Sequence, residues 1–183
     1  MPHLTTRELA VAALFTALLA ASAFISVPVG SVPFTLQVYV VLLAGIVLGP
    51  RLGALSVAAY LLLGLVAPVY SAGASGLGTL LGPTGGYLVG FAAAAALAGL
   101  IAGGPDTGVP RLVVAGLAGI APIYILGATW LALQLDLPPA TAVATGVAPF
   151  VWVDVLKVVA AVLTARALVT LPLGLPAASK RVH

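Results

Sequence analysis

The sequence predicts an all-α integral membrane protein with six transmembrane helices, and composition, segmentation and charge distribution all support this. Of its 183 residues, 62% are hydrophobic and 6% are charged, whereas soluble domains carry roughly a quarter charged residues. Mean hydropathy is +1.26. Apolar segments recur along the whole chain, separated by short breaks rich in glycine and proline. No polar stretch is long enough to build a second core, so we expect a single membrane domain over residues 1–183.

Six segments satisfy the length and hydropathy of helices, and proline and glycine mark where they end. We expect helices over residues 8–26, 35–48, 54–66, 84–102, 112–135 and 143–171. The first segment imitates a secretory signal, because Arg7 and an apolar run precede Ala21-Ser22-Ala23. Since the chain begins at Met1, we expect this segment to be a retained helix.

The basic residues predict the orientation of the helices. Between or beside the expected helices, Arg7, Arg51, Arg111, Arg166, Lys180 and Arg181 all fall at one face. Cytoplasmic loops carry the excess of lysine and arginine, so both termini should be cytoplasmic. Lys157 is the one basic residue that this rule does not explain.

The connection over residues 67–83 differs from a flexible linker. It has four glycines and no charge, but it also contains several large apolar side chains such as Tyr70 and Leu77. Such a loop suits folding back over a cavity, where its backbone can meet a ligand. The alternative is a re-entrant loop that only packs.

Asp154 and Lys157 are charged residues near the middle of the last apolar segment. Three residues apart on a helix, they share one face. Charge at that depth is expensive in lipid, so the pair should face protein, water or a ligand. The two charges could instead simply neutralise each other inside the bundle. With the polar Gln37 and the uncharged outer loops at the same side, we expect an outward-facing site for a small polar solute.

Several function classes are excluded or unsupported. Seven basic and four acidic residues are too scattered for a nucleic-acid surface. The chain has no cysteine, and its histidines are His3 and His183, so we expect neither a disulfide, a metal site nor a cofactor. No hydrolase or metalloprotease motif occurs, and no P-loop, so we expect neither an enzyme nor a self-contained ATPase.

Four blocks of sequence, in order and spacing, resemble the BioY family of biotin transporters. These are residues 32–37 (VPFTLQ), 48–54 (LGPRLGA) and 81–87 (LGPTGGY), followed by Asp154-x-x-Lys157. The match covers nearly the whole chain. One local departure is Trp152-Val153, where the family pattern usually has Pro-Gly before the acid.

The resemblance implies a six-helix substrate-capture subunit of an energy-coupling-factor transporter, placed in a bacterial cell membrane. Such a subunit binds biotin at the outer face and works with a transmembrane coupling subunit and two ATPase subunits. The resemblance assigns Asp154 and Lys157 to the biotin site. It also makes Ala13, Ala17 and Ala21 candidates for contact with the coupling subunit. This stripe of small residues would equally suit packing inside the chain, and the oligomeric state, including a homo-oligomer, stays open.

The chemistry of biotin suits these residues. Asp154 can accept from ureido N–H groups, and Lys157 can donate to the ureido carbonyl or neutralise the carboxylate of the tail; which end each holds stays open. Further candidate contacts are Phe34, Tyr70, Tyr87 and Trp152 as apolar walls, with Gln37 and Ser75 as polar partners. Tyr70 and Tyr87 could instead be interfacial anchors, and Gln37 could bridge two helices.

Two alternative functions remain compatible with the sequence. The first is capture of a different vitamin by the same architecture, since pocket residues decide the ligand. The second is a self-sufficient proton-coupled carrier, in which Asp154 shuttles a proton and Lys157 is its counter-charge.

Overall fold

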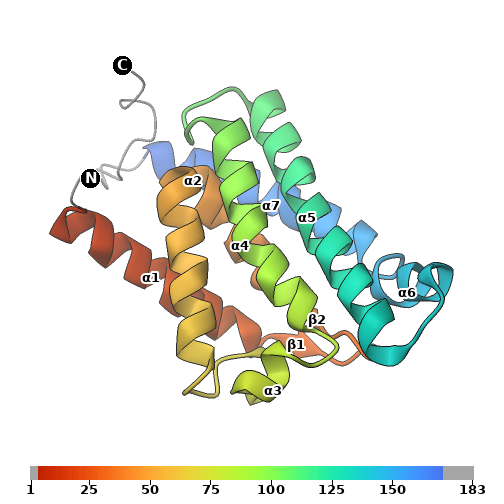
Figure 1. Cartoon of the computed structure of the whole chain (residues 1–183). Coiled ribbons are helices and arrows are strands. Elements are labelled where there is room, and N and C mark those ends of the chain that lie inside the picture. Colours follow the sequence, from red (N-terminus) through yellow and green to blue (C-terminus); the bar gives the residue numbers. More distant parts are fainter. Residues whose placement is uncertain (1–3, 171–183) are drawn as a thin grey trace.

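The computed structural model describes residues 4–170, which are mainly helical (Figure 1). In chain order, the elements are α1 (Thr6–Ala23), β1 (Ser26–Val27), β2 (Phe34–Thr35), α2 (Gln37–Gly64), a 3-10 turn (Ser71–Gly73), α3 (Leu77–Leu80), α4 (Gly85–Ala102), α5 (Val109–Leu135), α6 (Pro139–Gly146) and α7 (Val151–Thr170). Lys180 and Arg181, two of the basic residues that predict the orientation of the helices, lie outside the described residues.

Local sequence explains both ends of α1. Its start is a capping box, in which the Thr5 side chain accepts from the backbone of Glu8 and the Glu8 carboxylate accepts from the backbone of Thr5. The helix ends at Ala23 rather than near residue 26, because Ser26–Val27 pairs antiparallel with Phe34–Thr35. The short break between the first two predicted helices is therefore a small β-hairpin.

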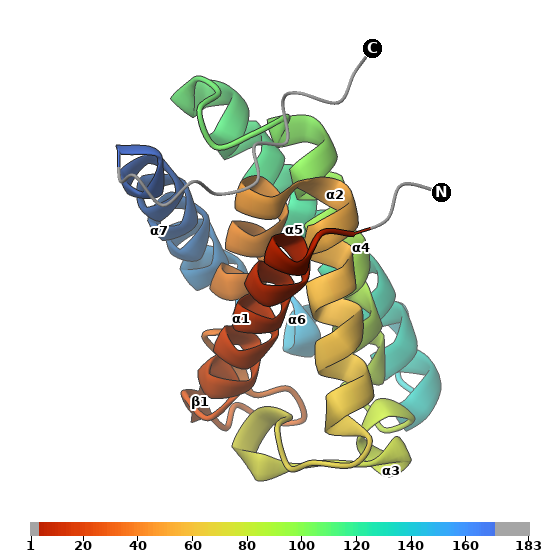
Figure 2. The same cartoon turned by 90° about the vertical axis from the view of Figure 1, so that its left-hand side faces the viewer.

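Helix α2 consists of two halves that double back on each other at Gly49. This glycine has φ +79°, a left-handed conformation that side chains disfavour, and Pro50 starts the second half with its fixed φ. The predicted break is confirmed, although only Gly49 is non-helical and the second half starts earlier than residue 54. Both ends of α2 lie at the end of the molecule that carries β1, β2 and α3 (Figures 1 and 2).

Glycines bring α4 into backbone contact with its neighbours. A Cβ atom at Gly99 would lie 2.5 Å from the Pro50 nitrogen, and one at Gly90 would lie 2.8 Å from the Ile123 Cα atom. Helix α4 therefore packs closely against the α2 break on one side and against α5 on the other. Small residues allow this approach between helices that would otherwise have little reason to associate in lipid.

The prediction of a single helix over residues 143–171 is wrong. The chain forms α6 and α7, which are bent by 50° at a short break. Pro149 lies in that break; it lacks an N–H for the helical hydrogen bond, and its ring disfavours a continuous helix. Asp154 consequently lies in the first turn of α7, not in the middle of a long span.

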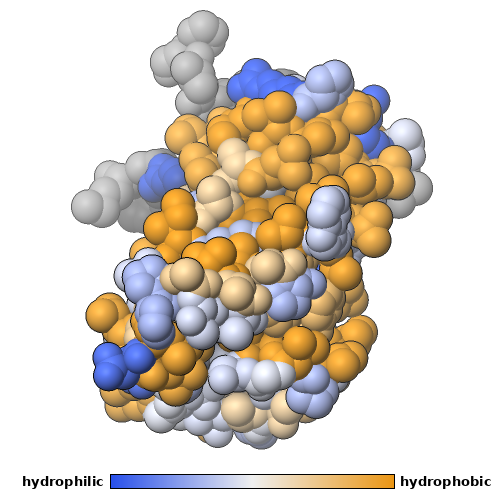
Figure 3. Space-filling view, turned by 90° about the vertical axis from the view of Figure 1, so that its right-hand side faces the viewer, coloured by the Kyte–Doolittle hydropathy of each residue, from blue (hydrophilic) through white to orange (hydrophobic). Residues whose placement is uncertain are grey.

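Within residues 4–170, four helices are long and apolar enough to cross a membrane, and the bent pair α6–α7 makes a fifth candidate. The flank of the molecule is largely hydrophobic (Figure 3). The first turn of α1, the Gly49 break and the end of α7 lie toward the end opposite β1, β2 and α3 (Figures 1 and 2). The connection after α2, predicted to lack helix, contains a 3-10 turn and α3.

Candidate ligand-binding site

A cavity of about 340 Å³ lies beneath the β1–β2 hairpin and the connection that follows α2. Helices α4, α5 and α7 form its other walls. Apolar side chains such as Val32, Leu88, Phe91 and Ile123 line much of it, alongside a few polar groups. This size and character are typical of sites for small organic ligands.

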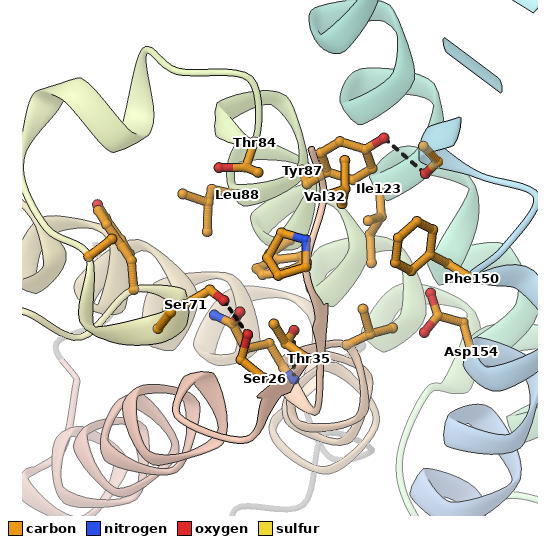
Figure 4. A pocket seen from close by; sticks show the side chains of 18 of the residues that line it. Ser26, Val32, Thr35, Ser71, Thr84, Tyr87, Leu88, Ile123, Phe150 and Asp154 are labelled. Carbon is orange, nitrogen blue, oxygen red and sulfur yellow. Dashed lines mark hydrogen bonds between the residues drawn. The ribbon is translucent and has the colours of Figure 1, made fainter. Parts of the chain in front are cut away.

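A buried three-residue cluster forms one wall of this cavity. Lys157 Nζ donates to Asp154 Oδ1 at 2.6 Å, and the two residues are 8% and 3% exposed. The Tyr124 hydroxyl, from α5, donates to Asp154 Oδ2 at 2.6 Å. In Figure 4, the Asp154 carboxylate projects from α7 near Phe150 at the edge of the cavity. Each carboxylate oxygen keeps capacity for a further donor.

Tyr124 was not among the predicted site residues. It lies near the middle of α5, in a helix that the sequence does predict. A phenol at that depth is a polar group in need of a partner, the same signal that drew attention to Asp154. The signal was present in the sequence, but nothing local showed that Asp154 was the partner.

One aromatic ring contacts the lysine, and a second ring packs beside the first. Lys157 Nζ lies 4.8 Å from the centroid of the Phe34 ring, a cation–π distance. The Phe34 and Phe150 rings are 5.1 Å apart at a tilt of 30°. Phe34 thus contacts the charged group rather than lining the cavity itself, whereas Phe150 lines it.

Tyr70 and Tyr87 both line the cavity, and their hydroxyl groups are bound to backbone. Tyr70 donates to the Leu61 carbonyl at 2.6 Å, and Tyr87 donates to the Gly146 carbonyl at 2.9 Å. Burial raises the pKa of Tyr70 above its ordinary value, so its hydroxyl stays a donor. Both residues are buried, whereas interfacial anchors face the headgroups.

Gln37 reaches the cavity from the first turn of α2. Its Nε2 atom donates to the Tyr60 hydroxyl at 2.6 Å, and that hydroxyl donates to the Val69 carbonyl at 3.2 Å. The predicted bridging role is therefore present, because the amide connects the two halves of α2. Gln37 also lines the cavity.

A contact between two loops spans the cavity at the end of the molecule that carries the β1–β2 hairpin. Ser26 Oγ in β1 and Ser71 Oγ in the 3-10 turn lie 2.8 Å apart, and both residues line the cavity (Figure 4). The cavity is therefore covered by segments that are far apart in the sequence.

Some predicted residues do not meet the cavity. Trp152 is 78% exposed on the outside of α7, and Ser75 is exposed, with its carbonyl accepting from Thr79. Neither lines the cavity. Ala13, Ala17 and Ala21 are exposed along one face of α1. Within residues 4–170, no group of three possible metal-ligating side chains is close enough to hold an ion.

Comparison with known proteins gives one consistent result. The model of the BioY family matches residues 1–172. A biotin transporter BioY from Thermotoga maritima is 44% identical over 160 residues, which span 87% of this chain and 94% of that protein. A probable biotin transporter BioY from Pyrococcus horikoshii is 42% identical over 163 residues, which span 88% and 96%.

A solved structure agrees in fold. It is the crystal structure of the S-component for biotin from an ECF-type ABC transporter, and it superposes with a TM-score of 0.84 at 28% identity. The superposition covers 92% of this chain and 96% of that chain. From the match along nearly its whole length, the chain belongs to the BioY family.

Proposed function

We propose that this chain captures biotin at the outer face of a bacterial cell membrane, as the substrate-specific subunit of an energy-coupling-factor transporter. The observation that carries the proposal is the buried Asp154–Lys157 pair, completed by Tyr124 and facing a largely apolar cavity. Relatives named as transporters, and an S-component for biotin with the same fold, support it. None of these relatives is named as an enzyme.

The site has a partner for each part of biotin. Asp154 offers acceptor capacity for ureido N–H groups, and Lys157 has donors left after its bond to Asp154. The rings of Tyr70, Tyr87 and Phe150 provide apolar surface for the thioether ring and the tail. Because Asp154 and Lys157 form an ion pair, the two residues together add no net charge to the cavity wall.

We further propose six membrane crossings with both termini cytoplasmic. The count of six follows if each half of α2 crosses separately and α6–α7 crosses once. Arg51, Arg111 and Arg166 lie near the α2 break, the start of α5 and the end of α7, respectively. The end of the molecule that carries these three arginines is therefore the cytoplasmic end in this proposal, because cytoplasmic loops carry the excess of basic residues. The cavity then opens outward.

The exposed face of α1 suits a partner helix. Ala13, Ala17 and Ala21 leave a shallow surface, flanked by Leu14 and Leu18, which are 57% and 41% exposed. A surface of this kind allows a second helix to approach closely in lipid. We assign this face to the transmembrane coupling subunit. Two ATPase subunits would supply the energy, since the chain has no P-loop.

Titration calorimetry of the purified protein tests the site. We expect wild-type protein to bind biotin tightly and Lys157→Met to lose binding, because the variant removes the ammonium donor and leaves the Asp154 carboxylate buried without its ion partner. The affinity should fall by about 100-fold or more, the size expected when a charged partner is removed.

Melting temperatures of the biotin-free proteins serve as the control for folding. A variant with near wild-type stability and unchanged biotin affinity would contradict the proposed site. Tight binding of riboflavin or thiamine in place of biotin would instead show that the chain captures a different vitamin. Uptake in cells without any coupling subunit, abolished when the proton gradient is collapsed, would show a self-sufficient carrier.

A further inference from the structure

Gln37 has one side-chain atom without a protein partner at the cavity. The residue is 2% exposed, and its Nε2 atom donates to the Tyr60 hydroxyl. Across residues 4–170, no donor reaches Gln37 Oε1, yet every fully enclosed side-chain nitrogen or oxygen there has a partner. The small exposed surface of Gln37 must therefore include Oε1. Because Gln37 lines the cavity, this oxygen faces it.

Tyr60 decides which half of the Gln37 amide faces the cavity. The Val69 carbonyl can only accept, so the single hydroxyl proton of Tyr60 is used in the bond to Val69. The Tyr60 oxygen is then left as an acceptor, and only the NH2 half of the amide can face it. The carbonyl half is directed the other way.

Packing holds Tyr60 in this orientation. It is completely buried and does not line the cavity. Its ring meets the Tyr70 ring edge-to-face, with centroids 5.7 Å apart. The Tyr70 ring lies directly over Gly64, where a Cβ atom would collide with it, and its hydroxyl is bound to Leu61. Both tyrosines are thus fixed against the second half of α2.

We propose that Tyr60 is a positioning residue, which holds Gln37 so that the cavity presents a carbonyl oxygen to an N–H donor of the ligand. This inference rests on the proposed function, in which the donor is a ureido N–H of biotin. A ligand with an acceptor at the same place would face the Gln37 oxygen with no proton between them, an unfavourable arrangement in a buried site. Tyr60 therefore contributes to specificity without touching the ligand.

The test is titration calorimetry with biotin and with its two mono-N-methyl ureido analogues, each lacking one N–H. We compare wild type, Tyr60→Phe, Gln37→Leu and the double variant. Tyr39→Phe is the matched control. It also deletes a partly buried hydrogen bond from a tyrosine hydroxyl, in this case to Thr164, but Tyr39 does not line this cavity. Melting temperatures are measured for all five proteins.

Tyr60→Phe should weaken biotin binding by about 5- to 20-fold, the size of one lost hydrogen bond in a buried site. The double variant should bind like Gln37→Leu, because Tyr60 acts through Gln37. Wild type and Tyr39→Phe should bind the analogue that lacks the N–H facing Gln37 more weakly than they bind biotin. In Tyr60→Phe and Gln37→Leu, the affinities for biotin and for that analogue should no longer differ. Unchanged affinity or unchanged discrimination in Tyr60→Phe would overturn the proposal, and so would additive losses. Wild-type protein that does not bind biotin would instead overturn the proposed function.

A second measurement needs no variant of Tyr60. The chain has two glutamines, Gln37 and Gln134, so selective ¹⁵N-glutamine labelling gives two side-chain amide signals. Gln134 is exposed. The NH2 protons of Gln37 should exchange with D2O more slowly than those of Gln134, both with and without biotin. Rapid exchange of Gln37 that becomes slow only with biotin would overturn the proposal, because the NH2 half would then face the ligand.

Discussion

At the scale of single residues, the charged part of the cavity wall depends on how the Asp154 carboxylate is shared between two donors. One oxygen accepts from Lys157 on the same helix, and the other accepts from Tyr124 on α5. Burying a charged pair is stabilising only when its remaining polar atoms are also satisfied. Tyr124 provides that satisfaction and fixes the plane of the carboxylate, so that its free acceptor positions are held in place before a ligand arrives.

Replacing Tyr124 with phenylalanine tests this role. The change removes the donor to Asp154 Oδ2 while keeping the ring. We expect biotin affinity to fall about 10-fold, which corresponds to roughly 1.4 kcal/mol and to one hydrogen bond to a charged group. Titration calorimetry measures the change, with Tyr39→Phe as the control. An affinity within twofold of wild type would show that Lys157 alone orients the carboxylate.

At the scale of elements, the α2–α4 contact depends on glycine rather than on large apolar side chains. Gly45 and Gly99 face the backbone of the opposite helix, so neither position has room for a Cβ atom. The same contact positions the α2 break, and with it both halves of α2 that support the cavity. In lipid, close packing of this kind replaces the hydrophobic effect as the reason for two helices to associate.

Gly99→Ala should therefore lower the melting temperature. An alanine in a helix is ordinarily more stable than glycine by roughly 0.5–1 kcal/mol, but here its Cβ would lie 2.5 Å from the Pro50 nitrogen and 2.6 Å from the Gly45 oxygen. Overpacking of this kind typically destabilises by about 1–3 kcal/mol.

Gly78→Ala is the matched control for this change. Gly78 lies in α3, and a Cβ atom there would meet nothing within 4 Å. Its melting temperature should stay at or slightly above that of wild type. If Gly99→Ala melted at the same temperature as Gly78→Ala, the helices would have room to separate, and the close contact would not limit stability.

At the scale of the whole molecule, the arginines near the α2 break, the start of α5 and the end of α7 lie at the end opposite the cavity (Figures 1 and 2). The backbone carbonyls of Asp106 and Thr107 accept from Arg166, at 3.2 and 3.4 Å, and Arg111 donates to Ile101. These bonds tie the end of α7 to the loop between α4 and α5, and the start of α5 to the end of α4, at the end of the molecule away from the β1–β2 hairpin. An excess of cationic side chains at one end is what orients a multi-pass protein in the membrane.

Single cysteines test the orientation, and the natural chain has none to remove. Ser75→Cys lies near α3, and Asp106→Cys lies between α4 and α5; both positions are exposed. In intact cells, a membrane-impermeant maleimide should label Ser75→Cys and leave Asp106→Cys unlabelled until the membrane is permeabilised. The reverse pattern would place the cavity on the cytoplasmic side.

The sequence by itself determined the membrane class, the family resemblance and two features that depend on neighbouring residues. The break at Gly49 follows from glycine beside proline, and the pairing of Asp154 with Lys157 follows from one helical turn. These features are local, so composition and spacing are sufficient to predict them.

The tertiary structure decided which distant residues meet. Tyr124 reaches Asp154 across 30 positions, and Gln37 reaches Tyr60 across 23, whereas Trp152, only two residues from Asp154, faces outward. The break before α7 also depended on context, because a proline can kink a membrane helix or end it. Helix packing sets which faces meet, and no local rule contains that choice; for this reason the charged pair was visible in the sequence, but the groups that orient it were not.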